Sequence, residues 1–500
     1  MRTLFPAFVA TLAMLAAPFA IKPASAVNLN PRGLGQVLIF PYYTVNAGQD
    51  TLISIGNYGN TGKAMLVRVH EGYNARIVLD FGLLLSAHDV WTASISQLSE
   101  DGAAAIRTSD RSCTYPALGS TPRSFLSSNY TGQGIPPYGE PDSGPQTDAR
   151  TREGYIEVIA LYDTIPGSEI DQAITHVQNG TPGGGVPSCD SDVINFASMD
   201  EAAPTATLAG AGSIVNVGLG TFFGYAADAI DGFTDAVLFT ADGPFLGVSL
   251  GIANSADSAR VARARVAVGG RSLDLDYDLG IDAVSAVYMA DAIYNEYIVD
   301  PSLGAGTDWV VTMPTRNYYT DPALVPSDVG GAQDPRPPFN ELFLDGRADT
   351  ELAATVYDRE EGIVATIAGP CSGLCPPVSS GNVSLPYAVN VIGFGSAAGS
   401  DIGPSGVLGS HLVSFVVPPA SSDGYVDIDL TGTSGTQQLP AGFDSSGNEA
   451  KLVGLPVTGF MVYNIVNASA QPGLLANYSG AFAHRMTTSC LGDVDDCRAR

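Results

Sequence analysis

Short apolar runs separated by glycine and proline are the feature of this chain that most restricts its fold. The 500 residues include 57 glycines and 33 prolines. Between them, runs rich in β-branched and aromatic residues recur about every 10–15 residues. The first such runs are 36–43, 51–55, 63–70, 76–81 and 89–95. The pattern predicts a mainly β protein built of antiparallel β-sandwich domains with long loops.

Further strands are predicted along the rest of the chain, together with one or two short helices. These strands are 155–162, 213–223, 236–240, 309–313, 352–357, 388–394, 411–417, 425–430 and 457–465. A helix is predicted over 168–179, because Ser168 is a suitable N-cap, Ile170, Ile174 and Val177 share one face, and Gly180 ends the pattern. A second candidate helix covers 282–297, although its β-branched first half also fits a strand.

Long loops rich in Gly, Pro, Ser or Asp suggest how the chain is divided. They cover 127–150, 327–340, 369–386 and 431–450, and loops of this length are uncommon within compact domains. We therefore place a linker at 327–340. It would separate a β-rich region of one or more sandwiches, 27–326, from a C-terminal sandwich, 341–500.

The first 26 residues have the pattern of a signal peptide. Arg2 precedes an uncharged apolar run over 4–21, and Ala24-Ser25-Ala26 is a small-x-small cleavage pattern. We expect residues 1–26 to be removed and the protein to be secreted or held at the cell surface, with the periplasm as the alternative. No later run has the ~18–20 apolar residues of a membrane-spanning helix, so no membrane span is expected after cleavage.

The charge of the chain argues against nucleic acid as a partner. The formal net charge is −28, and removal of Arg2 and Lys22 with the leader makes it about −30. A field of this sign repels phosphate backbones. The one basic cluster, Arg260, Arg263 and Arg265, is interpreted as a solvated face.

The six cysteines predict disulfides in an oxidising compartment rather than a metal site. They are Cys113, Cys189, Cys371, Cys375, Cys490 and Cys497. Fifteen pairings are formally possible. Proximity favours Cys371 with Cys375 and Cys490 with Cys497, which leaves Cys113 with Cys189.

One enzymatic pattern occurs in the chain. Residues 247–251 match the G-x-S-x-G of serine hydrolases, which would make Ser249 a nucleophile with His411 or His484 as its base. The preceding Asp-Gly-Pro breaks the strand that should lead into such a turn, and chance alone produces about half a match in a chain of this composition. A glycine-rich strand or turn is the alternative interpretation.

Paired aspartates suggest two other kinds of chemistry. Asp427 and Asp429 lie two apart on a predicted strand, so both face one side about 7 Å apart, a spacing compatible with an inverting glycosidase. The commoner interpretation of two acidic residues so placed is that they lie on the solvent-exposed face of an antiparallel strand and have no catalytic role. Calcium is the one cofactor that the sequence suggests, and its candidate ligands are Asp274, Asp276 and Asp278, or Asp493 and Asp495 with Asp496.

Several sequence blocks resemble a family of secreted proteobacterial proteins of unassigned role. The longest is NPRGLGQVLIFPYYTVN at 30–46, and similar blocks lie at 78–81, 88–91, 151–155, 306–311 and 475–478. The resemblance spans most of the mature chain. It implies export but brings no activity and no catalytic residue.

These observations favour an exported, non-catalytic binding or structural protein. Its expected partner is a protein or glycan at the cell surface, with self-association as a further possibility. The leader, the sandwich pattern and tyrosines expected in exposed loops, such as Tyr130 and Tyr138, support this hypothesis. The alternatives are a secreted hydrolase that acts on an extracellular polymer and a calcium-dependent adhesive module.

Overall fold

The computed structural model of the protein describes most of the chain. The described residues are 26–178, 181–182, 184–189, 201–238, 247–253, 262–327, 331, 333–368, 383–395, 403–417, 422–432, 435–467, 471, 474 and 476–492. The predicted leader up to residue 25, the pair Cys371 and Cys375, and Asp493, Asp495 and Cys497 lie outside them. Within the described part, no helix is long and apolar enough to cross a membrane.

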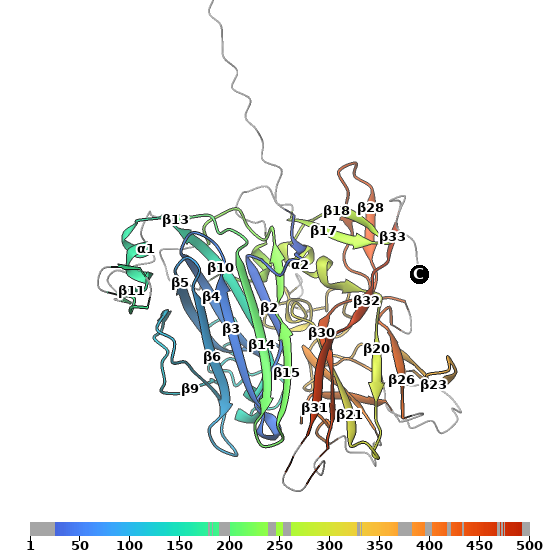
Figure 1. The fold of residues 1–500 in the computed structure, drawn as a ribbon. Coiled ribbons are helices and arrows are strands. Elements are labelled where there is room, and N and C mark those ends of the chain that lie inside the picture. The colour runs from blue at the N-terminus through green and yellow to red at the C-terminus, as the bar shows by residue number, and fades with distance from the viewer. Residues whose placement is uncertain are drawn as a thin grey trace, which may run out of the picture.

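Two sheets form the first sandwich, on the left of Figure 1. In spatial order, the eight-stranded sheet holds β1 (Asn28–Leu29), β16 (Asp228–Asp231), β2 (Val37–Thr44), β10 (Glu153–Thr164), β4 (Lys63–Glu71), β5 (Ile77–Leu85) and β8 (Cys113–Tyr115), with β13 (Glu201–Ala202) paired to β10. The six-stranded sheet holds β15 (Thr221–Ala226), β14 (Leu208–Asn216), β3 (Asp50–Asn57), β6 (Val90–Gln97), β7 (Ala104–Arg107) and β9 (Arg123–Ser124).

Alternate residues of these strands fill the space between the two sheets. Phe40 and Val67 point inward from the eight-stranded sheet and Ile53 from the six-stranded sheet, all buried. Across the interface the rings of Phe81 and Trp91 lie 5.6 Å apart. Each fully buried large apolar side chain contributes about 1.5–3 kcal/mol, so this core is a main source of stability.

A second sandwich, on the right of Figure 1, packs against the first. Its inner sheet holds, in spatial order, β25 (Val413–Val417), β24 (Val389–Phe394), β21 (Ala305–Thr312), β30 (Thr458–Ile465) and β31 (Tyr478–Ala483). Its outer sheet holds β23 (Ile363–Ala368), β22 (Ala353–Tyr357), β26 (Asp423–Asp429), β20 (Ala292–Ile298) and β32 (Arg485–Thr487). Among the described strand pairs only β24 with β25 is parallel. The prediction of a mainly β, antiparallel fold is confirmed.

The inner sheet is covered on both faces. On one side Phe394 stacks on Tyr297 of the outer sheet, with ring centroids 5.3 Å apart. On the other side Phe460 stacks on Tyr225 of the first sandwich at 4.8 Å. Because the inner sheet in turn helps to cover the eight-stranded sheet, every residue of β2, β4 and β10 is buried.

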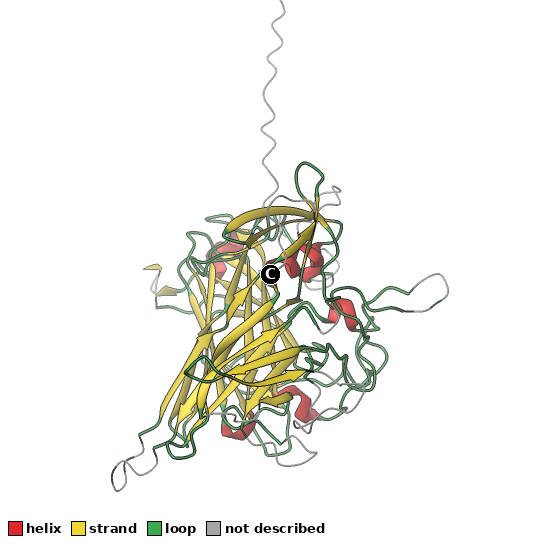
Figure 2. Cartoon of the chain, turned by 90° about the vertical axis from the view of Figure 1, so that its right-hand side faces the viewer, coloured by secondary structure: helices red, strands yellow, loops and turns green. Residues whose placement is uncertain are grey.

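Smaller elements close the structure at its ends, as Figure 2 shows from the side. A five-stranded sheet at the top of Figure 1 holds β17 (Ala262–Val268), β18 (Arg271–Tyr277), β27 (Gly442–Phe443), β28 (Glu449–Leu452) and β33 (Cys490–Gly492). The two-stranded sheets are β11 (Val177–Gln178) with β12 (Thr181–Pro182), and β19 (Met289–Ala290) with β29 (Leu455–Pro456). The described helices are α1 (Glu169–Ile174), α2 (Gly280–Tyr288) and α3 (Asn317–Thr320), with the 3-10 turns η1 (Asn46–Gly48), η2 (Asp148–Arg152) and η3 (Leu250–Ile252).

The predicted helices are shorter in the structure, and one predicted strand is a hairpin. Ser168 caps α1 as expected, with its hydroxyl accepting a bond from the Asp171 amide. The candidate helix 282–297 ends at Tyr288, and its second half forms β19 and β20. The expected strand 213–223 is divided between β14 and β15. Residues 236–238 form no strand.

The predicted linker 327–340 does not separate two sheet systems. Strands that precede it pair with strands that follow it: β20 with β26, β21 with β24 and β30, and β18 with β27. The division between the two sandwiches falls instead between β16 and β17. Loop composition marks where strands end, but it carries no information on which distant strands pair.

The predicted Cys113–Cys189 disulfide is present and joins positions 76 residues apart. Cys490 is also disulfide-bonded, and its predicted partner, Cys497, lies outside the described residues. Disulfides of this kind are usual in exported proteins.

A buried network of charges attaches the long loop 127–150 to the first sandwich. Arg150 binds Glu71, with Nε 2.7 Å from Oε2, and also binds Asp142, with Nη1 2.6 Å from Oδ1. Arg76 binds Asp321 next to α3, with Nε 2.6 Å from Oδ2. All five side chains are almost completely buried. Because these charges are desolvated, each depends on its partner.

We predict that Arg150→Ala lowers the free energy of unfolding by about 3–5 kcal/mol, because it leaves two carboxylates buried without their cation. Chemical denaturation monitored by tryptophan fluorescence measures the loss. The matched control is Arg265→Ala, which breaks an exposed Arg–Asp pair and should cost less than about 1 kcal/mol. Equal losses in the two variants would contradict the role given to the buried network.

Candidate binding surface

Ser249 lies in a capping turn rather than in a strained nucleophile turn. Its backbone is extended, at φ −163° and ψ 170°, and its hydroxyl accepts a hydrogen bond from the Gly251 amide at 3.3 Å as the cap of η3. The phenol of Tyr318 also hydrogen-bonds to Ser249, which partly offsets the rise in the pKa of Tyr318 caused by burial. The glycine-rich turn of the alternative interpretation is therefore what the structure contains.

The structure does not bring Ser249 together with the histidines predicted as its base. The His484 ring is buried in the second sandwich, where Nε2 lies 2.8 Å from the Val310 carbonyl oxygen. His411 donates its backbone N–H to Glu153. Among the described residues, no histidine hydrogen-bonds to Ser249.

The Asp274 and Asp276 carboxylates, proposed as calcium ligands, are paired with arginines. In the hairpin of β17 and β18, Arg265 lies opposite Asp274, and Arg263 lies opposite Asp276. Each pair is bidentate, with Nε–Oδ1 distances of 2.6 Å. Arg263 and Arg265 thus neutralise Asp276 and Asp274 on one face of the hairpin, while Arg260 lies outside the described residues. The described residues contain no group of three or more His, Cys, Asp or Glu side chains placed to hold a metal ion.

Tyr130 and Tyr138 are not exposed loop tyrosines, so that prediction is wrong. Tyr130 is fully buried beneath Arg150, whose guanidinium carbon lies 4.5 Å from the ring centroid. Tyr138 is only partly exposed and covers Arg76 at the same distance. Both rings pack on the buried network, so they serve the fold rather than a partner.

Asp427 and Asp429 belong to a larger surface, which we call the tyrosine–acid face. It is the outward side of β20, β22 and β26, and strand register arranges it in rows. One row is Glu296, Tyr425 and Tyr357, and the next is Tyr294, Asp427 and Thr355. A third is Ala292, Asp429 and Ala353. The predicted placement of both aspartates on one strand face is correct, and tyrosines lie beside them.

Two depressions lie along this face. The first, of about 720 Å³, is lined by Tyr294, Glu296 and Tyr425 among others. The second, of about 480 Å³, is lined by Asp427 and Asp429. Because Tyr294 and Asp427 are opposite each other in register, the depressions adjoin, and the face offers a strip rather than a single hole.

Tyr425 forms an aromatic wall of the larger depression. Its ring is stacked on that of Tyr357, with centroids 4.4 Å apart and planes 6° apart. Tyr425 lines the depression and Tyr357 does not, so Tyr357 supports the wall from behind. Tyr425 remains 38% exposed, and such a supported, exposed ring is available for stacking.

The strip is negatively charged. Six carboxylates and two guanidinium groups line the two depressions. Both arginines are already paired, Arg485 with Glu296 at 2.7 Å and Arg359 with Asp423 at 2.8 Å. The hydrogen bond from Arg485 lowers the pKa of Glu296, which keeps this carboxylate ionised. The face therefore favours neutral or positively charged ligands.

A buried carboxylate near Ser249 makes stability depend on pH. Glu157 points from β10 into the interior, with Oε1 3.7 Å from Nη1 of Arg68. Burial raises the pKa of Glu157 to about 7, although Arg68 opposes the shift. Nearby, burial lowers the pKa of His70 to about 3. Glu157 and His70 thus both resist ionisation.

We predict that the wild-type protein loses stability relative to Glu157→Gln as the pH rises from about 4.5 to 7. The unfolded carboxyl releases its proton near its ordinary pKa of 4.5, whereas the folded one keeps it until about 7, so stabilisation present at low pH is lost. The change amounts to up to about 3 kcal/mol. Burial keeps the folded His70 ring, 3.9 Å from Glu157, neutral over this range, and the unfolded ring titrates alike in both proteins, so His70 cancels in the comparison. Denaturation curves across this range test the prediction, with the exposed Glu449→Gln as control, and parallel curves for wild type and Glu157→Gln would contradict it.

Comparison with known proteins adds no family to this picture. No protein-family model, no curated protein and no solved structure matches the chain. The resemblance to secreted proteobacterial proteins stays a prediction from the sequence blocks.

Proposed function

We propose that this protein is an exported, non-catalytic binding protein of the cell surface or extracellular space, and that its tyrosine–acid face holds a glycan. The observation that carries the proposal is the exposed Tyr425 ring, supported by Tyr357, in an open depression with planar polar groups around it. A sugar ring has an apolar face that packs on an aromatic ring and hydroxyls that bond carboxylates and guanidinium groups.

The shape and charge of the face narrow the class of glycan. The two adjoining depressions extend along three strands, which suits several consecutive sugar units better than a single one. The excess of carboxylates favours neutral sugars or sugars that carry amino groups over acidic sugars. The Cys113–Cys189 disulfide is consistent with a protein that functions outside the cytoplasm.

We predict that Tyr425→Ala weakens glycan binding about tenfold, because the lost ring contact is worth about 1–2 kcal/mol. Calorimetric titration with cello-, manno- and chito-oligosaccharides, the last with and without N-acetyl groups, measures the effect. Tyr58→Ala is the matched control, since Tyr58 is 59% exposed on the first sandwich. Unchanged affinity in Tyr425→Ala, or no binding of any of these sugars by the wild type, would refute the proposal.

Hydrolysis is the second candidate, because Asp427 and Asp429 line the depression next to the tyrosines. Against it, Oδ1 of Asp429 accepts bonds from both the amide and the hydroxyl of Thr431, which is a turn-stabilising arrangement. We predict that bound oligosaccharides are not cleaved during prolonged incubation, as measured by reducing ends. Release of reducing ends that Asp427→Asn or Asp429→Asn abolishes would establish the hydrolase instead.

A further inference from the structure

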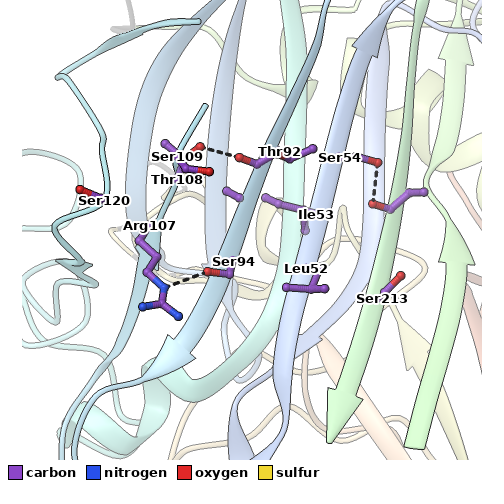
Figure 3. A pocket seen from close by; sticks show the side chains of 12 residues that line it. Leu52, Ile53, Ser54, Thr92, Ser94, Arg107, Thr108, Ser109, Ser120 and Ser213 are labelled. Atoms are coloured by element: carbon purple, nitrogen blue, oxygen red, sulfur yellow. Dashed lines mark hydrogen bonds between the residues drawn. The ribbon is translucent and has the colours of Figure 1, made fainter. Parts of the chain in front are cut away.

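A third depression lies on the first sandwich, on the outward side of the six-stranded sheet. Figure 3 shows it from close by. Ser54 comes from β3, Thr92 and Ser94 from β6, Arg107 from β7 and Ser213 from β14. The volume is about 600 Å³. We call this depression the hydroxyl trough.

The trough has walls as well as a floor. The segment that joins β7 to β9 contributes Ser109 and Ser120 along one side, as Figure 3 shows, and β14 lies on the other. Leu52 adds an apolar surface and is 44% exposed. A depression of this volume, with an exposed apolar side chain on its surface, can accept a ligand that contains several sugar rings.

The chemistry of the lining differs from that of the rest of the surface. Seven of the twelve described lining residues carry a hydroxyl, and the only ionisable one is Arg107. This is unusual in a chain with 51 acidic and 23 basic residues. Hydroxyls donate and accept hydrogen bonds, so they match a ligand that is itself rich in hydroxyls.

Arg107 is held in place but is not neutralised. Its Nε lies 3.3 Å from Oγ of Ser94, to which it donates. It forms no ion pair with any described residue, whereas Arg263, Arg265 and Arg485 on other strand faces are each paired with a carboxylate. An exposed guanidinium with free N–H groups is suited to bidentate recognition of a carboxylate.

We propose that the hydroxyl trough binds uronic acid units of an anionic polysaccharide. Arg107 forms an ion pair with the carboxylate, the serine and threonine hydroxyls hydrogen-bond to the sugar hydroxyls, and Leu52 packs on an apolar face of a sugar ring. An acidic peptide is a poorer match, because the backbones of β3, β6 and β14 are already paired on both sides. A peptide strand could not extend the sheet there.

This site is independent of the tyrosine–acid face. The two lie on different sandwiches and have opposite charge preferences, since one is lined by carboxylates and the other has an arginine and no carboxylate among its described lining residues. Either site can therefore fail its test without affecting the other.

The test is titration of the full exported protein with oligogalacturonate of defined length and with its carboxyl-reduced, neutral counterpart. We expect Arg107→Gln to weaken oligogalacturonate binding at least tenfold. Arg107→Lys should retain part of the affinity, because Lys keeps the positive charge but lacks the two parallel N–H donors that bind both carboxylate oxygens. The neutral counterpart should bind weakly and equally to wild type and Arg107→Gln. Arg32→Gln removes the same charge from another exposed position and should leave the affinity unchanged, as should Tyr425→Ala.

Three results would overturn the proposal. The first is no binding of oligogalacturonate by the wild type, and the second is equal affinity in Arg107→Gln. The third is a polyglutamate peptide that displaces oligogalacturonate at equal concentration, which would indicate simple attraction of negative charge. Unchanged thermal melting of Arg107→Gln shows that the variant is folded.

Discussion

The central strands β2, β4 and β10 of the eight-stranded sheet are covered on both faces, so the polar side chains on these strands have to find their partners inside the protein. One face packs on the six-stranded sheet, and the other on the second sandwich and α2. Lys63 is fully buried beside Asp163. Glu153 accepts hydrogen bonds from the Tyr42 hydroxyl at 2.8 Å and the Ser410 hydroxyl at 2.6 Å. Burial of unpaired groups would cost several kcal/mol each, so the Glu153–Ser410 contact, which joins the first sandwich to the second, helps to fix how the two meet.

Double burial also explains which parts of the fold the sequence could predict. The strand positions follow from local pattern, and 63–70 was correctly expected to be a strand because Met65, Val67 and Val69 alternate with other residues. The same alternation normally indicates a wet face, which would place Arg68 and His70 in solvent. Both are buried, because a partner from elsewhere in the chain covers them. The alternation of residues along a strand shows which side chains share a face, but it does not show which part of the chain packs on that face.

The candidate sites show the same limit. The spacing of Asp427 and Asp429 shows in the sequence that they share one face of a strand, and Tyr425 shares that face by the same alternation. Tyr294 lies on another strand, and only the pairing of the two strands shows that it lies beside Asp427. In the sequence, Arg263 and Arg265 form one pattern and Asp274 and Asp276 another. Their equal spacing on either side of a Gly-Gly turn was the signal that they pair. Arg107 gives no signal in the sequence, because its proposed role rests on the lack of an ion pair with any described residue.

The order in which strands pair sets the order in which the chain can acquire structure. All strands of the first sandwich lie between residues 28 and 231, where β1 pairs with β16. The second sandwich needs β20 to meet β32 and β21 to meet β30, which brings residues near 292 to those near 487. Closing such long loops is slow. The strands of the first sandwich can therefore pair before the last part of the chain is available, whereas the second sandwich, and with it the cover over β2, β4 and β10, must wait for the final strands.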